Sequence, residues 1–175
     1  MTSSHVIFWV IGTALTFWMV GAYNRLVRLR GDIVRQFAPM DVQFRLRQAL
    51  LLRQIDALAP TLVNAGPRLD ALRAACQQTD LAGAQAKLKP AAADAVTSLR
   101  VAEGILAEAR ARLPVQGAPG LDLADLATQL GATDSTLAFA RGQFNAAVQA
   151  YNQAVRQFPT LLVASVFGLH PASTL

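Results

Sequence analysis

The clearest structural signal in the sequence is LAFARGQFNAAVQAYNQAVRQFP, residues Leu137–Pro159. Apolar side chains recur in it every seven residues, with valines between them, which is the a/d pattern of a helix that packs in a left-handed bundle. Pro159 should end this helix, because proline lacks a backbone N–H and clashes with the preceding turn. The expected seam comprises Leu137, Phe144, Val148, Tyr151, Val155 and Phe158.

The chain upstream of this helix also carries helix signals and no strand pattern, since Ala, Leu, Gln and Arg dominate and β-branched alternation is absent. Apolar stripes at helical spacing begin at Phe44, Leu69 and Val96. The second stripe indicates a short helix, and the third a helix with Pro90 in its first turn. PVQGAPG, Pro114–Gly120, is the clearest loop. Short connections between such helices predict an antiparallel bundle of about four helices.

A charge-free apolar run, VIFWVIGTALTFWMVGAY, occupies Val6–Tyr23. A membrane-spanning helix needs about 20 residues, with a range of about 17–25, so this run is just long enough. Trp9, Trp18 and Tyr23 are aromatic residues of the kind that lies at the membrane–water interface. The expected fold class is therefore all-α, with one N-terminal transmembrane helix as an anchor at residues 1–24, followed by the bundle.

Positive charge follows the apolar run and does not precede it. Arg25, Arg28 and Arg30 come directly after the run, whereas MTSSH before it contains no Lys or Arg. A cleaved signal peptide is the alternative, but it would carry its positive charge first and a small-residue cleavage site afterwards. The charge bias predicts a single-pass anchor with the N-terminus outside and the bundle, residues 25–160, in the cytoplasm.

Apolar residues at helical spacing continue beyond the anchor, so we expect it to extend into the cytoplasm as one long helix. Pro39 should kink or end this helix. The residues with this spacing are Leu26, Leu29, Ile33 and Phe37.

The formal net charge of +5 is concentrated in one segment. Seven arginines lie within residues 25–53 against two aspartates, leaving nine basic and nine acidic side chains elsewhere. Because the basic segment directly follows an apolar helix, it favours membrane lipid as a partner and disfavours nucleic acid. Helical ion pairs are expected between Arg28 and Asp32 and between Asp41 and Arg45.

Residues that could carry out chemistry are few and scattered. The lone Cys76 lies on an apolar face, with no histidine near it in sequence to activate it, so we expect a small buried side chain. His5 and His170 stand at opposite ends of the chain, and Glu103 and Glu108 are five residues apart, off a common helix face. We expect no catalytic site, no metal and no cofactor.

Asn145 and Asn152 each follow an aromatic residue of the seam and lie on one face beside Arg141. They could form a polar strip for a partner helix, or they could make hydrogen bonds at the boundary of the bundle, which is the interpretation we favour.

A second apolar run, LLVASVFGL, Leu161–Leu169, is too short to span a bilayer. Left on the surface of a small bundle it would form an exposed apolar patch. We expect the apolar C-terminal tail, residues 161–175, to dock against a neighbouring subunit or the membrane interface close to the anchor, with Phe167 among its contacts. This arrangement would give a homo-oligomer.

Two stretches resemble the LemA family of bacterial membrane proteins. AYNRLVRLRGDIVRQFAPMDVQFRLRQALL, Ala22–Leu51, is similar to the family's segment from the anchor into the first bundle helix, most recognisably at YNRLVRLR and MDVQFRLR. LAFARGQFNAAVQAYNQAVRQFPTLLVASVFGL, Leu137–Leu169, resembles the family's AR-x-x-YN-x-x-V-x-x-YN motif, its FP stop and its Phe-Gly tail. The resemblance implies a single N-terminal anchor, with the N-terminus outside, and an antiparallel helical bundle.

The middle of the chain departs from the family pattern. Pro39 replaces a helix-compatible residue, LLLRQIDAL stands where an Ile-Pro-Asn-Leu turn is usual, and Asp134 lies near the place of a glutamate. These differences suggest a divergent member.

The family has no established catalytic activity, so the resemblance implies a shape and no reaction. We expect a non-enzymatic, self-associating scaffolding protein of the bacterial inner membrane, with another membrane protein as a further candidate partner. A signalling or envelope-stress adaptor that works through a membrane partner protein is the alternative.

Overall fold

The computed structural model describes residues 2–60, 66–113 and 123–175, and this part of the chain contains five helices and no strand. The expected all-helical bundle is confirmed, while the loop predicted at Pro114–Gly120 lies outside the described residues. The helices are α1 (Thr2–Leu58), α2 (Gly66–Leu88), α3 (Ala93–Ala111), α4 (Leu123–Arg156) and α5 (Thr160–Val166).

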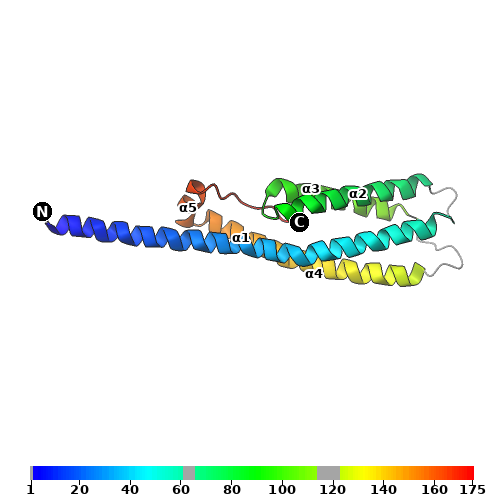
Figure 1. Ribbon diagram of the computed structural model, residues 1–175, viewed down its shortest axis with the longest axis horizontal. Helices are drawn as coiled ribbons and strands as arrows, with labels where there is room; N and C mark the ends of the chain where they lie inside the picture. Colours follow the sequence, from blue (N-terminus) through cyan, green and yellow to red (C-terminus); the bar gives the residue numbers. More distant parts are fainter. Residues whose placement is uncertain (1, 61–65, 114–122) are drawn as a thin grey trace.

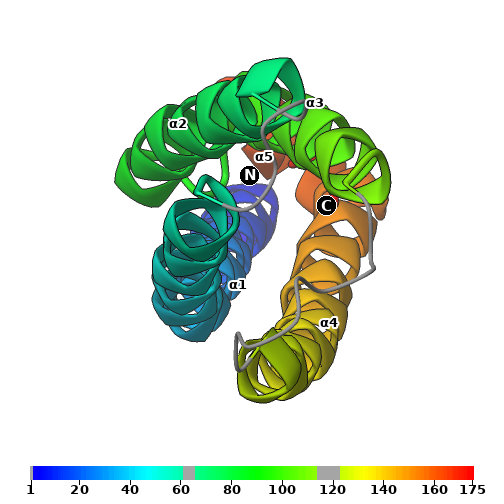
Figure 2. The ribbon, with the colours of Figure 1, turned by 90° about the vertical axis from the view of Figure 1, so that its right-hand side faces the viewer.

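The four longer helices alternate in direction and form an elongated antiparallel bundle (Figure 1). Close backbone packing joins α1 to α2 and α4, α2 to α3, and the short α5 to both α1 and α4. Seen end on, α1 to α4 stand around a common axis in chain order (Figure 2). The N-terminal part of α1 projects beyond the bundle (Figure 1).

Helix α1 passes through Pro39 and does not end there. The missing hydrogen bond is tolerated because Phe37 and Met40, on either side of the exposed proline, are buried against the rest of the bundle. The helix changes direction slightly near its middle (Figure 1), as expected for a proline inside a helix.

Three local expectations were wrong. Helix α2 has 23 residues and is not short. Pro90 lies in the turn before α3, whose N-cap is Ala92, so it does not occupy the first helical turn. Phe158 is 76% exposed because α4 ends at Arg156 and the following turn carries the ring away from the seam.

The buried side chains form two apolar clusters, one nearer the projecting end of α1 and one at the far end of the bundle. The first cluster contains Phe37 and Phe144, whose rings meet edge to face at 5.8 Å, and it confirms the rest of the predicted seam of α4. Cys76 is buried in the second cluster, as expected, and burial raises the pKa of its thiol.

The projecting part of α1 is apolar and exposed. Large apolar side chains between Ile7 and Val20 are 39–75% accessible, although such groups normally lie in a core. Among the described residues, α1 is the one helix long and apolar enough to cross a membrane, with an 18-residue window of mean hydropathy 1.3 that is only 6% buried.

Candidate functional site

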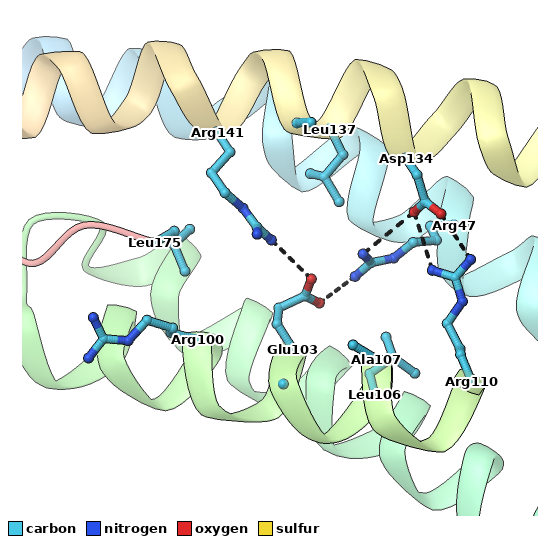
Figure 3. A pocket seen from close by; sticks show the side chains of 12 residues that line it. Arg47, Arg100, Glu103, Leu106, Ala107, Arg110, Asp134, Leu137, Arg141 and Leu175 are labelled. Atoms are coloured by element: carbon cyan, nitrogen blue, oxygen red, sulfur yellow. Dashed lines mark hydrogen bonds and ion pairs between the residues drawn. The ribbon is translucent and has the colours of Figure 1, made fainter. Parts of the chain in front are cut away.

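Helices α3 and α4 face each other across a groove, since close backbone packing does not join their described residues. One part of the groove, of about 410 Å³, is lined by charged residues from α1, α3 and α4 and by Leu175 of the tail (Figure 3). A second, more apolar part of about 520 Å³ continues beyond Arg110 and Asp134 towards the far end of the bundle.

The first part of the groove holds a network of ion pairs (Figure 3). Arg47 of α1, with a side chain only 8% exposed, donates to Glu103 of α3 and approaches Asp134 of α4 at 3.8 Å. Arg141 donates to the other oxygen of Glu103 at 3.2 Å, and Arg110 donates to both oxygens of Asp134 at 3.4 and 2.9 Å. Two carboxylates thus share three guanidinium groups from three helices.

This network separates the two apolar clusters. Arg47 lies between Phe44, which belongs to the first cluster, and Leu50, which belongs to the second. Its guanidinium carbon lies 5.4 Å from the centre of the Phe44 ring, a cation–π contact. Glu103 and Asp134 lie at the same level on α3 and α4, so a charged layer crosses the bundle at this point.

The chemistry that this groove offers is electrostatic. Guanidinium groups do not exchange protons in ordinary acid–base catalysis, and both carboxylates are already held by arginines. The buried Nε of Arg141 has no hydrogen-bond partner among the described residues. The arrangement is that of a cross-link between helices and lacks a nucleophile paired with a base.

Sequence reasoning missed this layer, although the sequence carried a signal for it. Val96, Glu103 and Arg110 recur every seven residues along α3, so the two charged residues lie on its inward face. Asp134 and Arg141 belong to the seven-residue series of α4 that continues with Val148 and Val155. Charges at core positions of neighbouring helices were the clue.

The asparagines of α4 hold the C-terminal tail. The amide of Asn152 donates to the carbonyl of Ala172 at 2.8 Å and accepts from its N–H at 2.8 Å. The amide of Asn145 does the same with Leu175, at 2.8 and 2.9 Å. The preferred interpretation, hydrogen bonds at the bundle boundary, therefore describes what these amides do. We call this arrangement the asparagine clamp.

The distance between the two asparagines along α4 matches the distance between the two tail residues that they bind. Seven residues of α-helix rise about 10.5 Å, and three residues of extended chain span about 10 Å. The tail after α5 has no regular secondary structure, so Ala172 and Leu175 can meet Asn152 and Asn145 in turn, with the tail antiparallel to α4.

Tyr151, which directly precedes Asn152 on α4, also binds the tail. Its hydroxyl donates to the carbonyl of His170 at 3.1 Å. Burial raises the pKa of Tyr151, against an opposing effect of Arg30, so the hydroxyl stays protonated as a donor. Because the folded pKa lies above the ordinary value of 10.0, this contribution to stability is present below pH 10 and is lost as the pH rises through the folded pKa.

The remaining candidate residues lie near the projecting end of α1. Trp9 and Trp18 are exposed, and Tyr23 contacts Phe167 of the tail with ring centres 4.7 Å apart. Phe167 therefore contacts its own chain, and the buried face of the tail, including Val163, lies in the chain's own core.

The basic segment is exposed at Arg25, Arg28 and Arg30. The expected pair between Asp41 and Arg45 is present at 3.3 Å. The expected pair between Arg28 and Asp32 is wrong, because Asp32 is bonded to Arg35 one turn further along α1.

Arg47 and Arg110 lie near Cys76, but no histidine lies beside it. The backbone carbonyl of Cys76 accepts a hydrogen bond from Gln48 at 2.7 Å. Within the described ranges, no group of three or more His, Cys, Asp or Glu side chains is placed to hold a metal ion.

We predict that Glu103→Gln destabilises the protein more than Arg47→Met. Loss of the Glu103 charge leaves Arg141 without its carboxylate and Arg47 with only the more distant Asp134, and breaking a buried pair costs about 3–5 kcal/mol. Loss of Arg47 leaves each carboxylate with one guanidinium. Denaturant unfolding of the full chain in mild detergent, followed by circular dichroism, measures both.

Glu108→Gln is the matched control, since Glu108 is on the same helix and its side chain is 65% exposed. It should change the free energy of unfolding by less than about 0.5 kcal/mol. Equal effects of Glu103→Gln and Glu108→Gln would contradict the cross-link.

We also predict that Asn152→Ala frees the tail without unfolding α4. Two hydrogen bonds are lost, each with a net contribution of about 0.5–1.5 kcal/mol. Hydrogen–deuterium exchange should accelerate in residues 170–175. Asn152→Asp should have an intermediate effect, because it keeps the acceptor and removes the donor. Asn24→Ala, at an exposed asparagine of α1, should leave exchange in the tail unchanged.

Comparison with known proteins identifies a family. A model of the LemA family matches residues 69–175, from the first turn of α2 through the asparagine clamp to the end of the tail. Of the two stretches with family resemblance, Leu137–Leu169 lies inside this match and Ala22–Leu51 lies outside it. No curated protein and no solved structure matches the chain. Since the match covers more than half of the 175 residues, the chain belongs to the LemA family.

Proposed function

We propose that this chain is a membrane-anchored, non-catalytic scaffolding protein that associates with further copies of itself through α1. Membership in the LemA family, which is not a family of known enzymes, supports a role in interaction. The apolar segment and the bundle share one uninterrupted helix, Thr2–Leu58, so an anchor here would hold the bundle directly and without a flexible linker.

The anchor crosses the bacterial inner membrane once, with the N-terminus outside and the bundle in the cytoplasm. The arginines that follow the apolar segment, at positions 25, 28 and 30, are exposed and free to lie at the cytoplasmic membrane surface. Each basic residue near an anionic surface contributes about 1 kcal/mol of attraction.

Cysteine labelling in intact cells tests this topology. In a Cys76→Ala background, we expect His5→Cys to react with a membrane-impermeant maleimide and Leu88→Cys, at an 82% exposed position, to react only after permeabilisation. Labelling of Leu88→Cys in intact cells would show that the orientation is inverted.

An exposed apolar stripe on the outer face of α1 carries the proposal of self-association. Val27, Val34 and Val42 are 45, 49 and 60% exposed, and Ala38 between them is also exposed. Their spacing of seven, four and four residues places them on one helix face. Single exposed apolar residues are ordinary, but four of them aligned on one face over about four turns of helix are typical of an interface.

The geometry favours a second copy of this chain as the partner that covers the apolar stripe. Copies anchored in one bilayer stand parallel and at the same height, so that Val34 of one copy meets Val34 of the next. A two-fold axis along the membrane normal then pairs the whole stripe with itself. Arg45, the next residue on this face, is held by Asp41 of its own helix.

We predict that the full chain in mild detergent is larger than a monomer and that Val34→Glu combined with Val42→Glu shifts it towards the monomer. In the assembly, each introduced glutamate would lose hydration and lie opposite the same glutamate of the other copy, so association would become unfavourable. Multi-angle light scattering and native mass spectrometry measure the size. Val101→Glu, at a 55% exposed valine of α3, is the matched control and should not change the size.

A monomeric wild-type protein, or an unchanged size of the double variant, would contradict self-association through α1. Co-purification of the monomer with an unrelated membrane protein in a fixed ratio would instead favour the adaptor function.

A further inference from the structure

Helix α5 and the turns on either side of it leave a cluster of large apolar side chains on the surface. Their exposed fractions are 46–76%, whereas the opposite face of the helix, with Val163 and Ala164, is buried in the first apolar cluster. The seven-residue helix α5 thus has one apolar face that is buried and another that is exposed. We call the uncovered set the α5 patch, and it consists of Phe158, Leu161, Leu162, Val166 and Phe167.

The α5 patch lies at the level of α1 where the charge-free run ends. Phe167 contacts Tyr23, the last residue of that run, and Val163 and Ala164 share a buried cluster with Ala22 and Leu26 of α1. Figure 1 shows α5 beside α1 at the end of the bundle nearest the projecting segment. If the run through Tyr23 fills the hydrocarbon layer, α5 lies within about one helical turn, or 5.4 Å, of its boundary.

The surroundings of the α5 patch carry positive charge. The exposed Arg156 ends α4 two residues before Phe158, and the exposed Arg25 and Arg28 follow Tyr23 within two turns along α1, at a similar level but on another face of that helix. Apolar side chains flanked by basic ones are the composition of an interfacial element, whose apolar face enters the acyl boundary while the charges meet the headgroups.

We propose that α5 is a second membrane contact, which inserts the α5 patch into the interfacial region of the same bilayer that α1 crosses. This inference rests on the anchoring of α1 in the proposed function. The bundle then meets the membrane at two points, the α1 helix and the α5 patch, and the asparagine clamp ties the chain after α5 back to α4. Two contacts fix the tilt of the bundle relative to the bilayer, which one helix alone does not.

A lipid surface fits the α5 patch better than a second copy does. The patch lies at the end of the bundle nearest the apolar segment of α1, at the level of Tyr23, and its aromatic residues Phe158 and Phe167 suit an interface between lipid and water. The apolar stripe of α1, in contrast, lies along the side of the bundle, where another anchored copy can reach it.

Depth-dependent fluorescence quenching tests the inference. The full chain in a Cys76→Ala background receives a single cysteine by Phe158→Cys, Val166→Cys, Leu15→Cys or Phe139→Cys, each labelled with an environment-sensitive dye. These positions are 58–76% exposed in the structure. The labelled protein is reconstituted in vesicles of zwitterionic and anionic phospholipid that carry a nitroxide near the headgroup or deep in the acyl chain.

We expect headgroup-level nitroxide to quench the dye at residues 158 and 166 more than deep nitroxide does. The deep nitroxide should quench residue 15, in the middle of the apolar run, and neither should quench residue 139, an exposed site on α4 that is 19 residues from Phe158.

Quenching at residue 15 without quenching at residues 158 and 166 overturns the second contact and leaves the anchor intact. A blue-shifted, unquenched dye at residues 158 and 166 also overturns it, because the α5 patch is then covered by protein. Absence of quenching at residue 15 overturns both the anchor and the inference.

Discussion

The buried guanidinium of Arg47 is the constraint to which the bundle conforms. A charge in a core is tolerated only with partners of opposite charge, and both partners of Arg47 belong to other helices, Glu103 to α3 and Asp134 to α4. Described residues of α3 and α4 do not pack closely backbone to backbone, so the ion pairs join these helices, directly through Arg110–Asp134 and Arg141–Glu103 and also through Arg47 of α1. Sliding either helix by one residue moves its carboxylate by about 1.5 Å, which is enough to break the pair.

The two apolar clusters on either side of the charged layer are built from different parts of the chain. Beyond it, the far cluster joins α1 to α2, α3 and α4 through residues such as Ile55, Leu72 and Leu130. On the other side, the cluster nearer the apolar segment is completed by α5 and the tail, which contribute Val163 and Ala172. The asparagine clamp is therefore part of the structure that closes this end of the bundle, where the tail lies beside α4 and reaches the charged groove.

The uninterrupted α1 relates the bundle to the proposed membrane. Its first third is apolar and exposed, its remainder contributes core residues to both clusters, and its outer face carries the valine stripe. One rigid element would therefore set the height of the bundle, the direction from which another copy approaches and the level of α5.

Much of the fold followed from local rules acting on the sequence. The charge-free run up to Tyr23, the seven-residue seam of α4 and the stop at Pro159 depend on hydrophobic periodicity and backbone chemistry, which neighbouring residues alone specify. Local rules left open whether Pro39 kinks or ends the helix, and buried residues on both sides of the proline favour the continuous helix. The charged layer and the asparagine clamp join residues 20–87 positions apart, such as Asn152 with Ala172 and Arg47 with Asp134. Each of these residues has several plausible partners in the sequence, and only the packing of the helices selects one.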